Sequence, residues 1–162
     1  MSGNEQILAN LIRARAATEP DLDVLTFVDV AADGRLVDEV RTYAQLWQNG
    51  QRIAAALKAL GMKPGDTFAM VMDNHAEFVD LMVASSILGT IFVPIDPRTR
   101  GDKLAYMLDF AECKGAVVAD GALEAVREVW SKSADHWILP LHGGAAAGAT
   151  LRRILGADLP EP

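Results

Sequence analysis

Residues 67–95 read TFAMVMDNHAEFVDLMVASSILGTIFVPI, and this stretch decides the fold. Two short apolar runs, 67–72 and 91–95, have the length of buried strands, and the segment 77–88 between them repeats its apolar side chains at helical spacing. The alternation continues with a helix expected over 103–111, a strand over 116–119, a helix over 123–130 and a strand over 137–141. Strands that are apolar at nearly every position are typical of a parallel sheet. We therefore predict an α/β fold with a mostly parallel sheet and helices on both of its faces.

The residues before this region predict a helix, a β-hairpin and a second helix. The first helix is amphipathic and ends at Pro20. Segments 25–30 and 36–42 are β-prone and are separated by a turn, so they are expected to pair as a hairpin. Thr42 lies three residues before Gln45, which is the capping-box pattern, so the next helix is expected to begin there.

The composition is that of a globular domain. Of the 162 residues, 51% are hydrophobic and 23% are charged, close to the globular average. The formal net charge of −7 has the wrong sign for contact with phosphate backbones, so no nucleic-acid partner is expected. No run of about 18 uncharged apolar residues occurs, so no membrane span is expected either.

Cys113 is the single cysteine, so it forms no intrachain disulfide and no multi-cysteine metal site. We interpret it as a small buried hydrophobe in a helix that runs on from Tyr106. The first twenty or so residues do not have the pattern of a secretory signal. Together these features predict a cytoplasmic protein.

The chain is expected to divide into an α/β subdomain over 1–141 and a Gly/Ala-rich linker with a short tail over 142–162. Residues 143–150 come close to the pattern of a phosphate-binding loop. However, Ala149 stands where that loop needs the lysine that meets the phosphates. We therefore interpret these residues as linker.

Candidate ligand-facing residues follow the expected strands, because ligands bind open parallel sheets beyond the carboxyl ends of the strands. Asn74 and His75 follow one strand, and Asp96 and Arg98 follow the next. Asn74 and His75 either line a ligand or cap the helix that begins near residue 76. The capping alternative predicts that Asn74→Ala costs about 1 kcal/mol of stability. Arg98 either meets a phosphate or is an exposed loop arginine. No catalytic residue and no metal ligand is assigned.

Asp73, Glu77 and Asp80 recur at helical spacing around the start of the same helix. Acidic side chains in a first helical turn complement the helix dipole. We expect these three to form a solvated helix start rather than a paired-carboxylate site.

Several short segments share their order and spacing with a known family. They are RTYAQL at 41–46, AAALKALGMKPGD at 54–66, MDNHAEF at 72–78, LGTIFVPIDP at 88–97, KLAYML at 103–108 and GAVVAD at 115–120. In this combination the chain resembles the N-terminal segment of the adenylate-forming (AMP-binding) superfamily, the acyl-CoA synthetases and their relatives. Thr90 and Lys103 depart from the family's usual pattern, at positions that do not look catalytic. Within the family, the resemblance is nearest to crotonobetaine/carnitine–CoA ligases.

The resemblance implies a longer parent enzyme that uses ATP and Mg²⁺ to convert a small carboxylic acid to an acyl-adenylate, and then coenzyme A to release AMP. It also implies a Gly/Ser/Thr/Lys-rich phosphate loop, an acidic residue for Mg²⁺, a ribose-binding aspartate and a C-terminal domain with a lysine. The 162 residues contain no segment that matches these parts.

We therefore expect a scaffold segment that has no cofactor of its own and is inactive in isolation. Its expected partner is the remainder of the parent enzyme, or a second copy that associates through exposed apolar surface. Two alternatives stay open: a free-standing module that binds a small ligand, and a non-catalytic interaction protein.

Overall fold

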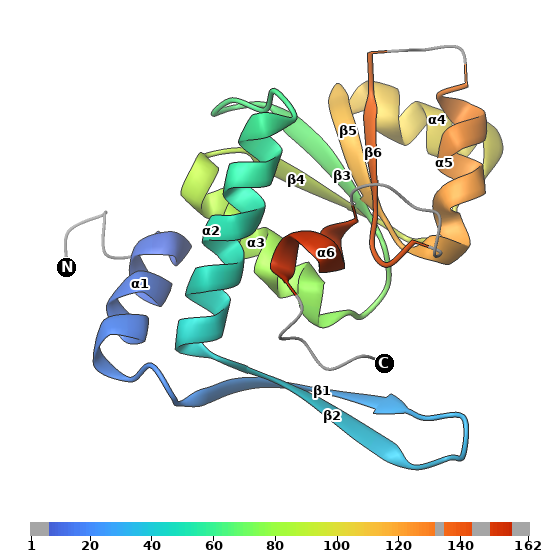
Figure 1. Cartoon of the computed structure of the whole chain (residues 1–162). Helices are drawn as coiled ribbons and strands as arrows, with labels where there is room; N and C mark the ends of the chain where they lie inside the picture. Colours follow the sequence, from blue (N-terminus) through green and yellow to red (C-terminus); the bar gives the residue numbers. More distant parts are fainter. Residues whose placement is uncertain (1–6, 132–134, 144–149, 157–162) are drawn as a thin grey trace.

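The computed structural model describes residues 7–131, 135–143 and 150–156. In chain order the elements are α1 (Leu8–Thr18), β1 (Asp23–Val30), β2 (Leu36–Thr42), α2 (Tyr43–Ala59), β3 (Thr67–Val71), α3 (Ala76–Leu88), β4 (Ile91–Ile95), α4 (Gly101–Phe110), β5 (Cys113–Val118), the short 3-10 helix η2 (Asp120–Ala122), α5 (Leu123–Val129), β6 (Trp137–Pro140) and α6 (Leu151–Leu155). Figure 1 shows their arrangement. Within these described ranges, each helix is too short or too polar to cross a membrane.

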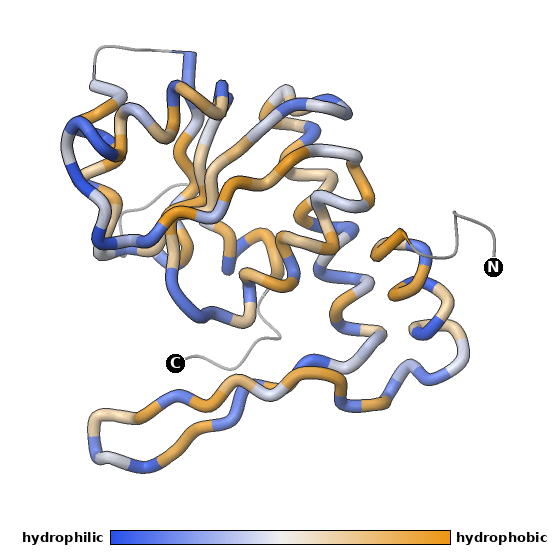
Figure 2. The backbone as a smooth tube through the Cα atoms, turned by 180° about the vertical axis from the view of Figure 1, so that it is seen from behind, coloured by the Kyte–Doolittle hydropathy of each residue, from blue (hydrophilic) through white to orange (hydrophobic). Residues whose placement is uncertain are grey.

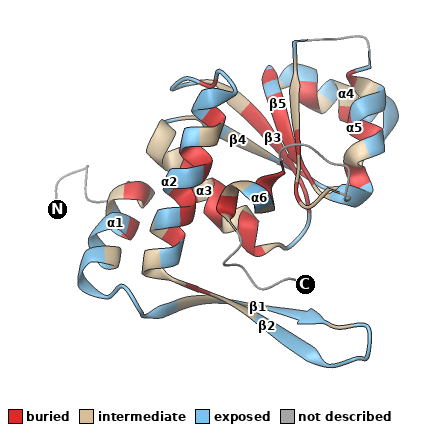
Figure 3. Ribbon diagram, in the orientation of Figure 1, coloured by how far each residue is buried: buried red, intermediate tan, exposed pale blue. Residues whose placement is uncertain are grey.

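The predicted α/β fold is confirmed. Strands β4, β3, β5 and β6 form a parallel sheet in that spatial order. The strands are apolar because side chains on both of their faces enter a core. Phe68 and Met70 pack against α2, α3 and α6 on one face, whereas Ala69 and Val71 pack against α4 and α5 on the other. Figures 2 and 3 show that β3 and β5 at the centre are hydrophobic and buried.

The strand order reverses between β3 and β5. The chain moves from β3 to its neighbour β4 on one side, and then crosses to β5 on the other side of β3. In open parallel sheets, such a reversal leaves a crevice at the carboxyl ends of the strands, where ligands bind.

Strands β1 and β2 form the predicted antiparallel hairpin, a sheet separate from the parallel one. The hairpin extends from the body of the molecule, and its far half is exposed (Figures 1 and 3). The side chains of Val28, Val30, Leu36 and Val37 are 50–71% exposed, although they are apolar.

Helix α2 begins at the predicted capping box. The Thr42 side chain accepts a hydrogen bond from the Gln45 backbone N–H, and the Gln45 side chain accepts one from the Thr42 N–H. Further along the helix, Gly50 lies against α3. A Cβ atom at this position would lie 2.6 Å from Cγ1 of Val83, so the close approach of α2 and α3 requires glycine here.

The element around Cys113 was predicted wrongly, although its burial was predicted correctly. Helix α4 ends at Phe110, and Glu112 then adopts a positive φ of 50°. This sharp turn lets Cys113 begin β5, so the residue belongs to a strand and not to the helix. The thiol is buried, and burial raises its pKa to about 11.

Residues 150–156 differ from the predicted linker and tail. Thr150 caps a short helix through its hydroxyl, which accepts a hydrogen bond from the Arg153 N–H. Leu151 and Leu155 of this helix, α6, are buried in the same core as α2 and α3. Burial of these two leucines explains why the segment folds back onto the body. The remaining predicted linker, 144–149, lies outside the described residues, and the boundary at residue 141 stays a prediction.

Candidate functional site

The carboxyl ends of the four parallel strands surround one cavity of about 420 Å³, at the point where the strand order reverses. We call it the strand-end cavity. It is lined by residues that follow β3, β4, β5 and β6: Asp73, His75, Pro97, Arg98, Arg100, Ala119, Asp120, Gly121, Ala122, Leu141 and His142. Its size and position suit a small ligand or part of a larger one.

A second cavity of about 530 Å³ adjoins the first, and we call it the hairpin cavity. It is lined by Phe27, Val28, Asp29 and Glu39 of the hairpin, by Asp73, Asn74, His75 and Ala76 before and at the start of α3, and by His142 and Arg152. Asp73, His75 and His142 line both cavities. The structure therefore brings His75 and Arg98 to the strand-end cavity, as the strand-end argument predicted, and places Asn74 in the neighbouring one.

Asp96 and Arg98 neutralise each other at the end of β4. Arg98 donates from Nη2 to Oδ2 of Asp96 at 2.6 Å and from Nε to Oδ1 at 3.0 Å. These hydrogen bonds, with one from the Arg98 backbone N–H, hold the pKa of the Asp96 carboxyl well below its usual range. The Arg98 side chain is 88% exposed, so this is a loop ion pair in which the guanidinium is already occupied.

Arg100 joins the loops that follow β4 and β5. It donates to the backbone oxygen of Pro97, to that of Thr99 at 2.9 Å and to that of Gly121 at 3.4 Å. Its guanidinium therefore supports one wall of the strand-end cavity through carbonyl groups.

His75, and not Asn74, occupies the N-cap position of α3, and it makes no side-chain capping bond. The capping interpretation of Asn74 and His75 is therefore wrong. Asn74 lies one residue before the N-cap position, and the His75 side chain makes no hydrogen bond to the first turn of α3. Instead, the Nε2 atom of His75 pairs with Oδ1 of Asp73 at 2.8 Å. Asn74 and His75 therefore line the cavities and do not cap α3, which was the structural alternative to ligand contact.

His142 faces His75 across the boundary of the two cavities. The ring centroids are 6.1 Å apart in an edge-on arrangement. Asp120 accepts hydrogen bonds from the backbone N–H groups of His142 and Gly143 at 3.2 and 3.1 Å. Burial, followed by the positive charge of Arg152, lowers the pKa of His142, which favours the neutral imidazole.

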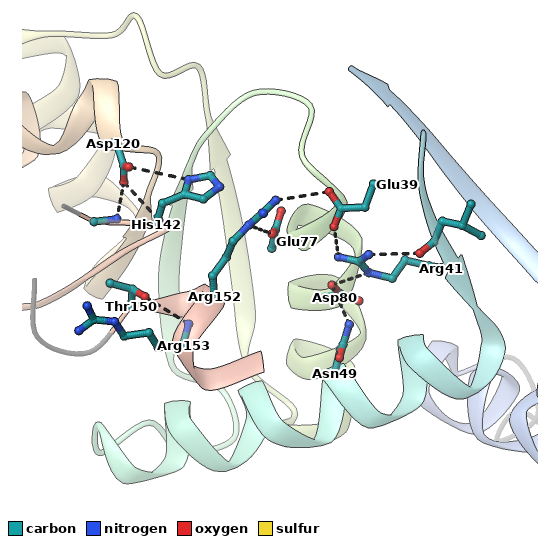
Figure 4. A network of polar contacts seen from close by, with 12 residues as sticks. Glu39, Arg41, Asn49, Glu77, Asp80, Asp120, His142, Thr150, Arg152 and Arg153 are labelled. Carbon is teal, nitrogen blue, oxygen red and sulfur yellow. Dashed lines mark hydrogen bonds and ion pairs between the residues drawn. The ribbon is translucent and has the colours of Figure 1, made fainter. Parts of the chain in front are cut away.

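Glu77 and Asp80 are fully buried, which corrects the prediction of a solvated helix start. Only Asp73 of the predicted series is exposed. Arg152 donates from Nε to Oε1 of Glu77 at 2.7 Å, and Arg41 donates from Nε to Oδ2 of Asp80 at 3.1 Å (Figure 4). The two acids therefore face inward, because arginines from α6 and β2 meet them there.

Glu39 completes this arrangement between the two arginines. Arg152 reaches its Oε2 at 3.3 Å. Nη2 of Arg41 lies 2.7 Å from Oε1 of Glu39, as an ion pair whose atoms are not aligned as a hydrogen bond. We call Glu39, Arg41, Glu77, Asp80 and Arg152 the buried charge cluster.

Burial raises the pKa of Asp80 to about 6, and the charge of Arg41 and a hydrogen bond from Asn49 at 3.2 Å oppose this rise only in part. Desolvation outweighs the attraction because Asp80 has no exposed surface.

Sequence reasoning did not find His142 or Arg152 as site residues, because both lie in the segment interpreted as linker and tail. A signal was present. Thr150 is a good N-cap residue, and Leu151 and Leu155 have the i, i+4 spacing of a buried helix face.

A third cavity, of about 500 Å³, lies at the opposite end of the sheet, next to Cys113 and Trp137 at the starts of β5 and β6. Among the described residues, no group of three or more His, Cys, Asp or Glu side chains could hold a metal ion.

The fold and the site define an open parallel α/β sheet with a ligand-sized cavity at its reversal point. Comparison with known proteins gives the family: the chain belongs to the AMP-binding enzymes, whose family model matches residues 12–152. This confirms the resemblance to the family, whereas the nearness to crotonobetaine/carnitine–CoA ligases stays a prediction.

The chain is 34% identical over 115 residues to "Long-chain-fatty-acid–CoA ligase FadD13" of Mycobacterium tuberculosis. That match covers 71% of this chain and 21% of the relative, so the chain spans about a fifth of the relative's length.

Solved structures show the same fold. A Mycobacterium tuberculosis fatty acyl CoA synthetase is 25% identical, with a TM-score of 0.71 over 93% of this chain and 28% of that one. A benzoate CoA ligase from Burkholderia xenovorans has a TM-score of 0.72 over 94% of this chain and 28% of that one. The latter is 17% identical, so its likeness concerns the fold alone.

Proposed function

We propose that this chain is the N-terminal scaffold portion of an ATP-dependent acid–CoA ligase. In the parent reaction, a carboxylate oxygen attacks the α-phosphorus of ATP, giving an acyl-adenylate and pyrophosphate. The thiol of coenzyme A then attacks the acyl carbon, gives the acyl-CoA and releases AMP. The observation that carries the proposal is the family match over residues 12–152, in a chain whose match to FadD13 covers about a fifth of that relative.

The described residues do not by themselves fit ATP or Mg²⁺. They contain no cluster of three metal-ligating side chains. The two arginines of the strand-end cavity are also engaged, Arg98 by Asp96 and Arg100 by backbone oxygens. ATP, Mg²⁺ and coenzyme A are therefore assigned to the parent enzyme, and the residues of this chain support and orient without carrying out a chemical step.

We propose that Asn74 and His75 face the acyl group or coenzyme A in the parent enzyme. His75 lines both cavities and Asn74 lines the hairpin cavity, and neither side chain caps α3, which supports this proposal. Arg98 is proposed to line the strand-end cavity as part of a neutral pair with Asp96, so that it shapes the entrance without adding net charge.

Acid-dependent exchange between ATP and pyrophosphate tests the proposal. The 162-residue chain is assayed beside the longest product of its gene, with a panel that includes short fatty acids and carnitine-like acids. We expect exchange by a longer product that contains the phosphate loop and none by the 162-residue chain. Removal of a single preorganised donor commonly costs about 10²–10³-fold in rate, and here a whole set is missing. Exchange by the short chain above a heat-killed control would contradict the scaffold role.

A specific observation supports an interaction role beside the scaffold role. The far half of the hairpin exposes Val28, Val30, Leu36 and Val37, an apolar surface on a two-stranded sheet with two open edges. Isolated two-stranded sheets are marginally stable in water. We propose that the remainder of the parent enzyme covers this surface, and that the isolated chain self-associates through it.

We also propose a cytoplasmic location for the parent enzyme. It is supported by Cys113, the single cysteine, which is a buried free thiol. The chain therefore has no intrachain disulfide that would need an oxidising compartment. Fractionation of cells that produce the full gene product, followed by immunoblotting, tests it.

A further inference from the structure

The buried charge cluster forms an open chain of alternating charges across three elements. Asp80 contacts Arg41 at 3.1 Å, and Arg41 contacts Glu39 at 2.7 Å. Glu39 then contacts Arg152 at 3.3 Å, and Arg152 contacts Glu77 at 2.7 Å. The chain begins and ends on α3, runs through β2 and passes through α6 (Figure 4).

This arrangement holds one more negative charge than positive, because it has three carboxylates and two guanidiniums. The imbalance is visible as missing hydrogen-bond donors. Oε2 of Glu77 and Oδ1 of Asp80 are both buried without a hydrogen-bond partner. A buried, charged acceptor without a donor is costly, and a proton bound to one carboxylate would neutralise the excess charge.

The groups around Asp80 and Glu77 come from every element packed on this part of α3. β2 contributes Glu39 and Arg41, α2 contributes the amide of Asn49, and α6 contributes Arg152. His142, after β6, is close enough to Arg152 and Glu77 for their charges to act on it. Helix α1 packs on this region through the apolar side chains of Leu8 and Ile12.

We propose that Asp80 binds a proton in the folded chain at mildly acidic pH, and that this proton latches the hairpin and α6 onto α3, so that their docking weakens as the pH rises. The latch connects to the proposed site directly, because Glu39 and Arg152 line the hairpin cavity. It would therefore make the shape of that cavity dependent on pH.

The direction of the effect follows from linkage. Burial raises the pKa of Asp80 from 3.8 to about 6 in the docked state, so the docked state binds the proton more tightly than an opened, hydrated one. Docking is then strongest below about pH 4, weakens mainly as the pH rises from about 4 to 6, and levels off above that window. With these two pKa values, the docking equilibrium falls roughly tenfold between about pH 5 and 7.5.

Two measurements on the full 162-residue chain test the latch. Carbon-detected NMR follows the titration of the Asp80 carboxyl, and we expect a midpoint near 6. Hydrogen exchange, corrected for the intrinsic effect of pH, follows peptides that cover 36–42 and 150–156. We expect their protection to fall roughly tenfold from about pH 5 to 7.5, as the linkage relation gives. Asp80→Asn mimics the protonated acid and should keep the protection high across this range.

Matched variants separate the latch from other titrations. Asp102→Asn removes an exposed acid from α4 and should leave the pH dependence unchanged. His142→Asn removes the nearby imidazole and should also leave it unchanged. An Asp80 midpoint below about 4.5, which is close to an ordinary aspartate, would overturn the proposal. The proposal would also be overturned if the pH dependence of the hydrogen-exchange protection persisted in Asp80→Asn and disappeared in His142→Asn. The wild-type NMR titration decides the matter even if Asp80→Asn fails to fold.

Discussion

Replacement of Arg152 by Gln should destabilise the chain far more than loss of an ordinary surface arginine. The change leaves Glu77, which is fully buried, without the Nε donor that now lies 2.7 Å from its Oε1. Removal of one partner from a buried pair costs about 3–5 kcal/mol. Because 18% of the Arg152 side chain is exposed, water can relieve part of this loss. We therefore expect the free energy of unfolding to fall by about 2–4 kcal/mol. At roughly 2–4 °C per kcal/mol for a chain of this size, Tm should fall by about 5–15 °C.

Thermal and urea unfolding measure this change, and two variants control it. Arg15→Gln removes an exposed ion pair with Glu19, whose side chains are 53% and 44% exposed, and should cost less than about 1 kcal/mol. The double variant Arg152→Gln with Glu77→Gln removes the stranded charge and should recover at least half of the loss. If the double variant is no more stable than Arg152→Gln alone, the loss does not come from a stranded carboxylate and the reasoning fails.

Three further substitutions test other parts of the structure. Gly50→Ala places a Cβ 2.6 Å from Val83, so we expect a loss of about 1–3 kcal/mol in urea unfolding, whereas Gly121→Ala, which meets no atom within 4 Å, should change little. Asn74→Ala should leave Tm within about 1 °C of the wild type, because the residue does not cap α3; a loss near the ~1 kcal/mol of a cap would restore the capping role. Leu36→Lys should weaken concentration-dependent self-association in sedimentation velocity, because it places a charge on the exposed hairpin surface; unchanged association would locate the contact elsewhere.

The elements that the sequence predicted are those whose signals are local. The capping box at Thr42 involves residues three apart, and the apolar run over 67–71 reflects burial on both faces of β3. In β4, at the edge of the sheet, only Ile95 is buried, and Phe92 and Val93 are partly buried against opposite cores. Hydrophobic burial needs no particular partner, so a pattern within one segment was sufficient. The boundary at Cys113 was missed because a single residue, Glu112, breaks the helix through its backbone conformation.

The buried acids could not be predicted in the same way. In the sequence, Glu77 and Asp80 look like a solvated first turn, because acids at helical spacing usually are. Their burial depends on Arg41, which is 39 residues from Asp80, and on Arg152, which is 75 residues from Glu77. Buried charge is acceptable only when it is paired, so the location of the partners had to be known first.

The same dependence explains why the tail belongs to the site. A run of glycine and alanine gives no burial signal, so the residues after it were interpreted as an extension of the linker. Yet Leu151 and Leu155 are buried in the core, and the helix that carries them positions Arg152 between Glu77 and the hairpin cavity. The two leucines therefore supply the packing that places the arginine, and the arginine supplies the charge that lets α3 bury its acid. The burial of an acid at the start of α3 therefore depends on core packing at the end of the described chain.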